Sequence, residues 1–172
     1  MNMISGEKVV LKGITKSDSS KIYEWVNKEE LRPLTGTLYP ISEYEHEEWV
    51  ERQSKNPNGK IFMVYEKESG QAIGTIGLKN FDHVNSNGEL YISLGEIFGG
   101  GYGKDAVVTL VNYAFLHLNF HRIYLHVFES NRRAIRCYEK AGFEKEGILI
   151  DHHFQNGRYE NVIIMGRVYS PQ

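Results

Sequence analysis

The sequence predicts an α+β domain with a mixed sheet of seven strands flanked by four helices, in the order β-α-α-β-β-β-α-β-α-β-β. Three observations predict this class. Short runs with alternating apolar residues recur along the chain and are typical of strands. Longer runs with apolar residues three and four apart follow capping residues, as in helices. The pair Asn156-Gly157 separates the last two alternating runs and indicates a hairpin.

The first half of the chain predicts one strand, two helices and three more strands. The first helix follows the capping residues of Thr15–Asp18, and the second follows the capping-box pattern Ser42–Glu45. Pro33, Gly36 and Pro40 predict an irregular stretch between the two helices. The expected elements are a strand at 9–11, helices ending near Asn27 and Ser54, and strands at 61–65, 72–78 and 89–94.

The second half predicts two helices and three strands. An apolar stripe from Ala106 to Phe115 follows a glycine-rich run and indicates a helix. Asn131 is positioned to cap another helix, which Gly142 ends. Strands are expected at 123–128, 148–154 and 159–168. No repeat, low-complexity segment or linker interrupts the pattern, so we expect residues 1–172 to form a single domain.

The composition excludes several classes of protein. A chain of 172 residues that is 41% hydrophobic and 24% charged can bury a core. Its net charge of −2 gives no basic surface for nucleic acid, and no apolar run reaches the ~18 residues of a membrane span. Cys137 is the single cysteine and cannot form an internal disulfide. The first six residues lack the features of a signal peptide, so we expect a cytoplasmic location.

The glycine-rich run between a strand and a helix predicts an anion site. The first amides of a helix have no internal acceptors, and the helix dipole favours negative charge there. Glycines permit positive φ and a close approach of the backbone. The run Gly99–Gly103 therefore predicts a pyrophosphate cradle, with Lys104 as an added charge. Asp105 after Gly103-Lys104 does not fit a Walker loop, and the spacing does not fit a dinucleotide fingerprint. A plain turn is the alternative interpretation.

Two separated motifs resemble the GNAT family of acetyltransferases. Phe98–Ala106 is similar to that family's coenzyme A loop, although Phe98 stands where Gln or Arg is usual. Glu129–Phe143 is similar to the later helix with its Asn…Ala…Tyr-x-Lys-x-Gly-Phe run. The Asp151–Met165 hairpin resembles the branch with ribosomal-protein and spermidine/spermine acetyltransferases. The resemblance covers almost the whole chain and implies acetyl-CoA as co-substrate.

The resemblance also implies which residues contact the cofactor. The main chain of Ile92 and Leu94, in the strand before the loop, would pair with the pantetheine arm. Asn131 would reach the cofactor in addition to capping its helix. The full implied cofactor-binding set is Ile92, Leu94, Phe98, Gly99, Gly100, Gly101, Tyr102, Gly103, Lys104, Asn131 and Lys140.

The implied catalytic residues are Tyr138 and Glu89. A tyrosine hydroxyl can donate the proton that the leaving coenzyme A thiolate needs. The attacking amine starts protonated, so a base or a water must remove a proton, and Glu89 is the candidate. Ser93 and His126 are weaker candidates. Each of these residues also has an ordinary structural interpretation, as a core aromatic or a strand residue.

Covalent and metal chemistry are not expected. Cys137 points about 100° away from Tyr138 on a helix and lacks a His/Asp partner pattern, which favours direct transfer over an acyl-enzyme. His152 and His153 are adjacent on a strand and face opposite sides, so no metal site is predicted.

The acceptor is the open question. Acidic and aromatic residues gather in the first third of the chain, which suits a polyamine, a basic protein N-terminus, or simply a solvated helix face. These residues are Glu29, Glu30, Glu43, Glu45, Glu47, Glu48, Tyr39, Tyr44 and Trp49. A polyamine or other small amine is the first hypothesis; a protein N-terminal amine or an amino-sugar nucleotide is the alternative. A non-catalytic coenzyme-A-binding regulatory module is the hypothesis from another class. Dimers are common among such relatives, so a homodimer is a candidate assembly.

Overall fold

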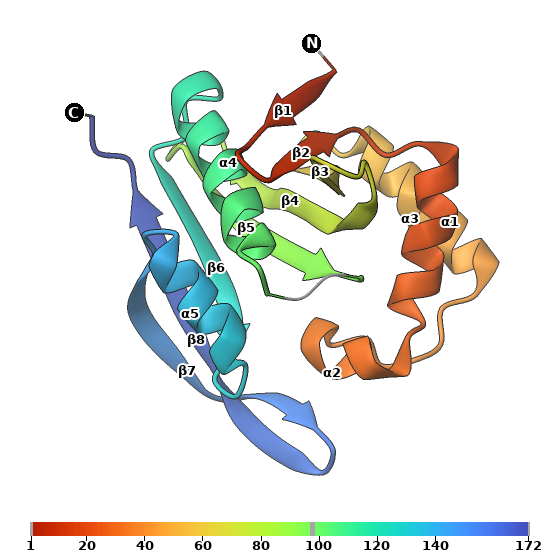
Figure 1. Ribbon diagram of the computed structural model, residues 1–172. Helices are drawn as coiled ribbons and strands as arrows, with labels where there is room; N and C mark the ends of the chain where they lie inside the picture. The colour runs from red at the N-terminus through yellow and green to blue at the C-terminus, as the bar shows by residue number, and fades with distance from the viewer. Residues whose placement is uncertain (1, 97–98, 172) are drawn as a thin grey trace.

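One mixed sheet organises the chain in the computed structural model, which describes residues 2–96 and 99–171 (Figure 1). Within these residues the sheet has eight strands in the order β1-β2-β3-β4-β5-β6-β8-β7. Neighbouring strands are antiparallel except β5 and β6, which are parallel. The strands are β1 (Met3–Ser5), β2 (Val9–Lys12), β3 (Lys60–Glu66), β4 (Ala72–Asp82), β5 (Asn87–Leu94), β6 (Arg122–Phe128), β7 (Glu144–Gln155) and β8 (Arg158–Val168).

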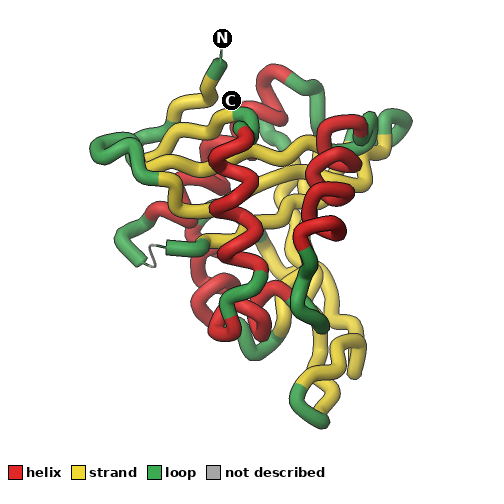
Figure 2. Tube along the Cα trace, turned by 90° about the vertical axis from the view of Figure 1, so that its right-hand side faces the viewer, coloured by secondary structure: helices red, strands yellow, loops and turns green. Residues whose placement is uncertain are grey.

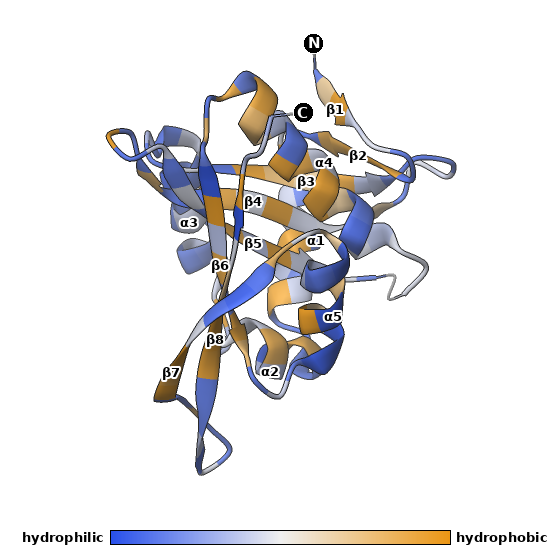
Figure 3. Cartoon of the chain, turned by 90° about the vertical axis from the view of Figure 1, so that its left-hand side faces the viewer, coloured by the Kyte–Doolittle hydropathy of each residue, from blue (hydrophilic) through white to orange (hydrophobic). Residues whose placement is uncertain are grey.

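Helices cover both faces of this sheet (Figure 3). On one face, α4 packs a buried stripe that includes Val107 and Leu110, and α5 adds Ile135. On the other face, Ile22 and Trp25 of α1 pack with Met63 of β3. The helices are α1 (Lys16–Val26), α2 (Arg32–Thr35), α3 (Glu43–Lys55), α4 (Tyr102–His117) and α5 (Arg132–Lys140), with a 3-10 turn η1 (Glu29–Leu31) before α2. None of the described helices is long and apolar enough to cross a membrane.

The predicted α+β class with a mixed sheet is confirmed, but the predicted counts of seven strands and four helices were too low. The sequence prediction missed β1, because three residues are too short to show an alternation. It also missed α2, a four-residue helix in the stretch expected to be irregular. Pro33 stands in the first turn of α2, where its missing N–H costs nothing, and Gly36 ends the helix at a φ of 74°.

The predicted helix starts and the final turn are confirmed. Thr15 and Ser42 each accept a hydrogen bond from a main-chain N–H at the start of α1 and α3, within complete capping boxes. Asn156 and Gly157 have φ angles of 52° and 76°, as a two-residue hairpin turn requires. The hairpin of β7 and β8 extends below the rest of the molecule (Figure 2). Its β7 strand begins at Glu144, four residues before the predicted start.

Candidate active site

Strands β5 and β6 pair only at their beginnings and then separate. Their parallel pairing covers Asn87, Gly88 and Glu89 of β5, and ends at Glu89 opposite Tyr124. β5 continues to Leu94 along β4, and β6 continues to Phe128 along β8. Figure 1 shows the two strands diverging toward their carboxyl ends. A gap therefore opens in the middle of the sheet, and we call it the β5–β6 gap.

The main chain of β5 presents free hydrogen-bonding groups to this gap. Gly95 donates its N–H to the carbonyl of Ile73 in β4 at 2.8 Å. Main-chain groups alternate in direction along a strand, so those of Ile92 and Leu94 point away from β4 and toward the gap. Neither residue has a ladder partner in the described part of β6. These are the two residues predicted to pair with the pantetheine arm.

The glycine run lies between the end of β5 and the start of α4. Gly99, Gly100 and Gly101 have φ angles of 83°, 65° and 80°, a region that other residues rarely adopt. Gly101 is the residue that precedes α4 and gives it no side-chain cap. The first amides of α4, at Tyr102 and Gly103, are thus available to an anion. Phe98, which was predicted to contact the cofactor, lies outside the described residues.

Two sets of polar contacts fix the loop and the helix start. The carboxylate of Asp105 accepts main-chain hydrogen bonds from Lys8 at 2.8 Å and Val9 at 3.0 Å, which ties α4 to β2. Lys8 also donates its ammonium to the carbonyl of Gly100 at 2.7 Å. Tyr102 donates its hydroxyl to Glu66 at 2.9 Å, so its ring belongs to this anchor. The sequence prediction did not identify Lys8 or Asp105.

Two lysines place positive charge beside the start of α4. Gly103 lies next to Leu94 and Cys137: a Cβ at Gly103 would meet Leu94 Cδ1 at 3.4 Å and Cys137 Sγ at 3.6 Å. Burial raises the pKa of the Cys137 thiol, while the charges of Lys140 and Lys104 lower it in part. Lys104 lies in the first turn of α4, and Lys140 lies in the last turn of α5.

Two more predicted residues of the later motif are the cap of α5, Asn131, and the helical residue Tyr138. Asn131 accepts a hydrogen bond from the N–H of Ala134 at 3.2 Å and so caps α5, as predicted. Tyr138 lies in the core with only 7% of its surface exposed, and burial raises its pKa. Its hydroxyl makes no hydrogen bond to the part of the protein that the structure describes. A phenol in this setting stays protonated at neutral pH.

Glu89 and His126 form a pair at the point where the two strands separate. His126 Nδ1 lies 2.6 Å from Glu89 Oε1, and Asn80 donates its side-chain amide to Glu89 Oε2 at 2.8 Å. Side chains of Glu89 and Ser93 share the face of β5 opposite to Leu90, which packs in the core under α4. The pair therefore lies on the sheet face away from α4 and α5. The sequence prediction missed Asn80, because it ended β4 at Leu78.

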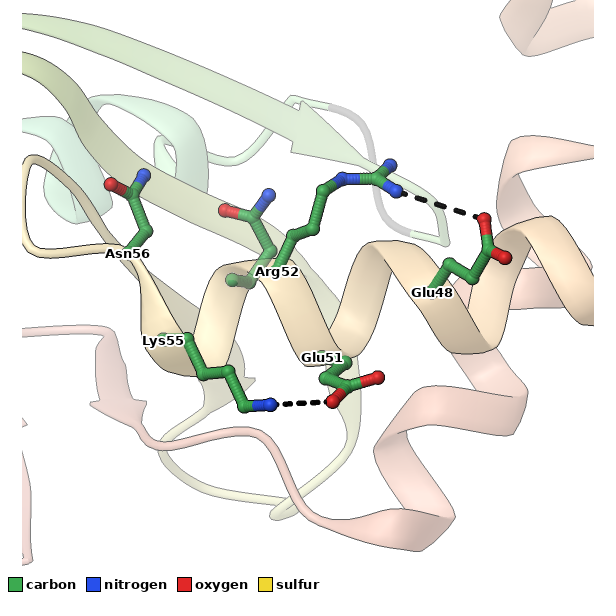
Figure 4. Close-up of a pocket in the computed structure, with 6 residues that line it drawn as sticks. Glu48, Glu51, Arg52, Lys55 and Asn56 are labelled. Carbon is green, nitrogen blue, oxygen red and sulfur yellow. Dashed lines mark hydrogen bonds and ion pairs between the residues drawn. The ribbon is translucent and has the colours of Figure 1, made fainter.

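One surface hollow lies away from this chemistry. It lies along the exposed side of α3, where Arg52 is 4.0 Å from Glu48 and Lys55 is 2.6 Å from Glu51 (Figure 4). Exposed ion pairs of this kind contribute little stability and are ordinary on a solvated helix. Trp49, one of the predicted acceptor residues, instead stacks on His46. Among residues 2–96 and 99–171 no cluster of His, Cys, Asp or Glu could hold a metal ion.

A family model, sequence relatives and a solved structure that match this chain are all acetyltransferases. The family model described as "Acetyltransferase (GNAT) domain" matches residues 8–144. A spermidine N(1)-acetyltransferase of Vibrio cholerae is 31% identical over 72% of this chain and 72% of its own length. An aminoglycoside N(6')-acetyltransferase of Klebsiella pneumoniae is 30% identical over 84% of this chain and 78% of its own. The solved spermidine N-acetyltransferase of Vibrio cholerae, in complex with CoA and spermine, has a TM-score of 0.85 and 27% identity, covering 94% and 95% of the two chains.

Proposed function

Because the chain belongs to the GNAT family of acetyltransferases, we propose that its acceptor is a polyamine or another small amine that carries several positive charges. The chain is an acetyl-CoA-dependent N-acetyltransferase. The observation that carries the proposal is the β5–β6 gap, which has the uncapped start of α4 on one side and the Glu89–His126 pair on the other. It offers one place for a donor and a separate place for an amine.

The residues around the gap fit acetyl-CoA. Three consecutive glycines with positive φ leave no Cβ atoms immediately before α4, and the amides that follow them have no side-chain cap. These amides, with Lys104 and Lys140, would hold the phosphates. The free main-chain groups of Ile92 and Leu94 would pair with the amides of the pantetheine arm. When bound, acetyl-CoA supplies an acetyl thioester with a carbonyl carbon open to attack and a thiolate as leaving group.

The other face of the sheet suits a cationic amine. Exposed acidic side chains gather on η1 and α3 of this face, and they attract a cation over a distance close to the ~8 Å Debye length of physiological salt. Tyr39 and Tyr44 are 74% and 80% exposed and free to stack on an ammonium group. The exposed acids are Glu29, Glu30, Glu43, Glu45, Glu47 and Glu48. Two relatives named for cationic amine substrates, spermidine and aminoglycosides, support this class of acceptor.

The proton balance of the transfer assigns roles to the two sides of the gap. An ammonium substrate must lose two protons before it becomes an amide. The Glu89–His126 pair takes the first proton, which frees the lone pair on nitrogen, and passes it to solvent. Tyr138 gives its proton to the departing thiolate, and the second proton from nitrogen restores the Tyr138 hydroxyl. The net reaction thus forms the C–N bond, breaks the C–S bond and releases one proton.

Thiol release from acetyl-CoA across a panel of amines tests the proposal. The panel contains spermidine, an aminoglycoside, a peptide with a basic N-terminus and an amino-sugar nucleotide. We expect turnover with spermidine or the aminoglycoside and a loss of turnover in Tyr138→Phe. Tight cofactor binding without turnover on any amine would favour the non-catalytic regulatory module, and turnover confined to the peptide or the sugar nucleotide would overturn the acceptor class.

We further propose that residues 1–172 act as one catalytic domain, that they work as a homodimer, and that they reside in the cytoplasm. A single sheet that contains both β1 and β8 supports the first point. The exposed apolar side chains of Ile148, Ile150 and Phe154 on β7 support an association through the hairpin. Sedimentation analysis measures the assembly, and a monomer at micromolar concentration would contradict the dimer.

A further inference from the structure

The carboxylate of Glu89 is engaged at both oxygens. Oε1 lies 2.6 Å from Nδ1 of His126, and Oε2 accepts the amide of Asn80 at 2.8 Å. The residue is only 8% exposed. A carboxylate held in this way is well placed to orient a neighbour and poorly placed to reach a substrate amine directly.

The contact with Glu89 determines which nitrogen of His126 carries the proton. An ionised carboxylate only accepts hydrogen bonds, so Nδ1 of His126 must be the donor. In the neutral imidazole the lone pair then resides on Nε2. No group in residues 2–96 and 99–171 bonds to Nε2, and 38% of the His126 side chain is exposed. The ring therefore presents an unshared lone pair outside the core.

The position of His126 on β6 places this lone pair at the β5–β6 gap. The last paired residues are Glu89 and Tyr124, and His126 lies two residues further along β6, where β5 has turned away. Its side chain shares a face with Tyr124, while Leu125 and Val127 point into the core that α4 and α5 cover. His126 thus borders the β5–β6 gap on the sheet face away from α4 and α5.

Asn80 fixes the orientation of Glu89 through a local irregularity in β4. The β4–β5 register shifts between Lys79 and Asp82, and Asn80 lies in this shift with a φ of 54°. Asparagine tolerates this left-handed conformation better than most residues. The irregularity directs the Asn80 amide at Glu89, and an amide nitrogen demands an oxygen as its partner.

We propose that Nε2 of His126 is the base that deprotonates the acceptor amine, and that Glu89 and Asn80 are positioning residues that select its tautomer. The proposal rests on the proposed function and deepens it. The ammonium N–H bond breaks, the proton moves to Nε2, and the electron pair stays on the amine nitrogen. The resulting imidazolium is stabilised by the Glu89 carboxylate until the proton passes to solvent.

Glu89→Gln tests the tautomer directly. The Asn80 amide donates in the wild type. In that orientation it turns the side-chain oxygen of the introduced glutamine toward Asn80 and its NH2 group toward His126. Nδ1 must then accept, which moves the imidazole proton to Nε2 and removes the base. We expect kcat to fall about 10²- to 10⁴-fold with a nearly unchanged KM for the amine. The ¹⁵N shifts of His126 should report a protonated Nε2 in this variant and a protonated Nδ1 in the wild type.

The double variant that combines Asn80→Asp with Glu89→Gln is the matched rescue. The introduced aspartate accepts the NH2 group of the introduced glutamine, so the glutamine oxygen turns back to His126 and Nδ1 becomes the donor again. Aspartate tolerates a positive φ as asparagine does. We expect the wild-type tautomer to return, with kcat recovering at least about tenfold over Glu89→Gln. A double variant with the tautomer restored and kcat still at the level of the single variant would overturn the proposal.

His126→Asn separates His126 from Glu89 as the base. The asparagine amide can replace the Nδ1–H donor to Glu89, but it has no counterpart of Nε2. We expect a loss of kcat as large as that of Glu89→Gln; near-wild-type kcat would overturn the proposal in favour of Glu89 itself. A wild-type protein that turns over no amine would instead overturn the proposed function. The tautomer of His126 is measured without substrate, so an Nδ1 found unprotonated in the wild type would overturn this inference alone.

Discussion

The two sides of the β5–β6 gap control their protons by opposite means. On the side of α5, the Tyr138 side chain packs in the apolar core, and its hydroxyl makes no hydrogen bond within the described chain. On the other face, both oxygens of Glu89 accept hydrogen bonds, and His126 depends on one of them. One group keeps its proton because burial disfavours the phenolate. His126 is oriented by a hydrogen-bond network in which Asn80 and His126 each donate to one oxygen of Glu89.

This difference predicts that each side tolerates a different kind of change. Tyr138 is positioned by the packing of its ring in the core. Removal of its hydroxyl alone should therefore change the structure little. His126 is oriented by its hydrogen bond with Glu89. Its proposed function should therefore be lost when that bond reverses its donor and acceptor. The proposed acid and the proposed base are thus open to separate experiments.

Tyr138→Phe should have the largest effect on activity and almost none on folding. We expect kcat to fall about 10²- to 10⁴-fold, because the thiolate loses its proposed proton donor. The free energy of unfolding should change by less than about 0.5 kcal/mol, since no hydrogen bond is lost. Thiol release and chemical denaturation measure the two quantities.

Tyr65→Phe is the matched control for this variant. The Tyr65 hydroxyl donates to Asp18 at 2.5 Å, and burial together with this bond raises the pKa of Tyr65. The control should lose about 1–3 kcal/mol of stability, because it removes a hydrogen bond to a charged group, and should keep its kcat. If Tyr138→Phe retained kcat, or lost as much stability as Tyr65→Phe, the contrast between the two sides of the gap would fail.

Gly101→Ala should mainly weaken cofactor binding. The residue has a φ of 80° immediately before α4, where a side chain adds about 1 kcal/mol or more of backbone strain. Relief of this strain displaces the first amides of α4, so we expect KM for acetyl-CoA to rise about tenfold with kcat little changed. Gly13→Ala is the control, because its Cβ meets nothing within 4 Å. Equal KM values for the two variants would show that the loop geometry does not govern binding.

Asn131→Ala should have a smaller effect, which falls on stability. Removing the cap of α5 costs about 1 kcal/mol, and Asn131→Asp should restore most of it because aspartate caps equally well. Since α5 carries Tyr138, fraying of its first turn should lower kcat about two- to fivefold. Thermal unfolding and thiol release give the two values. A full loss of activity in Asn131→Ala with a normal melting temperature would instead indicate contact with the cofactor.

The sequence predicted the parts of the fold and site that are local. The caps Thr15, Ser42 and Asn131 and the turn at Asn156 each act within a few residues, so their spacing was sufficient. The glycine run was placed correctly at the start of α4 for the same reason. The resemblance to a family added the roles of Tyr138 and Glu89, which remain predictions.

The missed features depend on contacts between distant parts of the chain. Asn80 reaches Glu89 through an irregularity in β4 that no periodicity reveals. The anchor of α4 joins Asp105 to Lys8 across 97 positions of sequence. Residues such as Asp105 resemble ordinary polar side chains until the sheet brings their partners together. The separation of β5 from β6 is likewise a property of the sheet rather than of either strand.

A further effect appears only at high pH and tests the buried side of the gap. Burial raises the pKa of Tyr138 above the ordinary value of 10.0. The stability that this shift contributes is complete below pH 10 and is lost as the pH rises toward the higher folded-state pKa. The unfolding free energy of the wild type should therefore decrease relative to Tyr138→Phe by up to about 1.4 kcal/mol for each pH unit above 10. The other tyrosines are common to both proteins and cancel in this difference. Parallel curves for the two proteins would mean that the Tyr138 hydroxyl ionises as if in water, and burial would then not be what holds its proton.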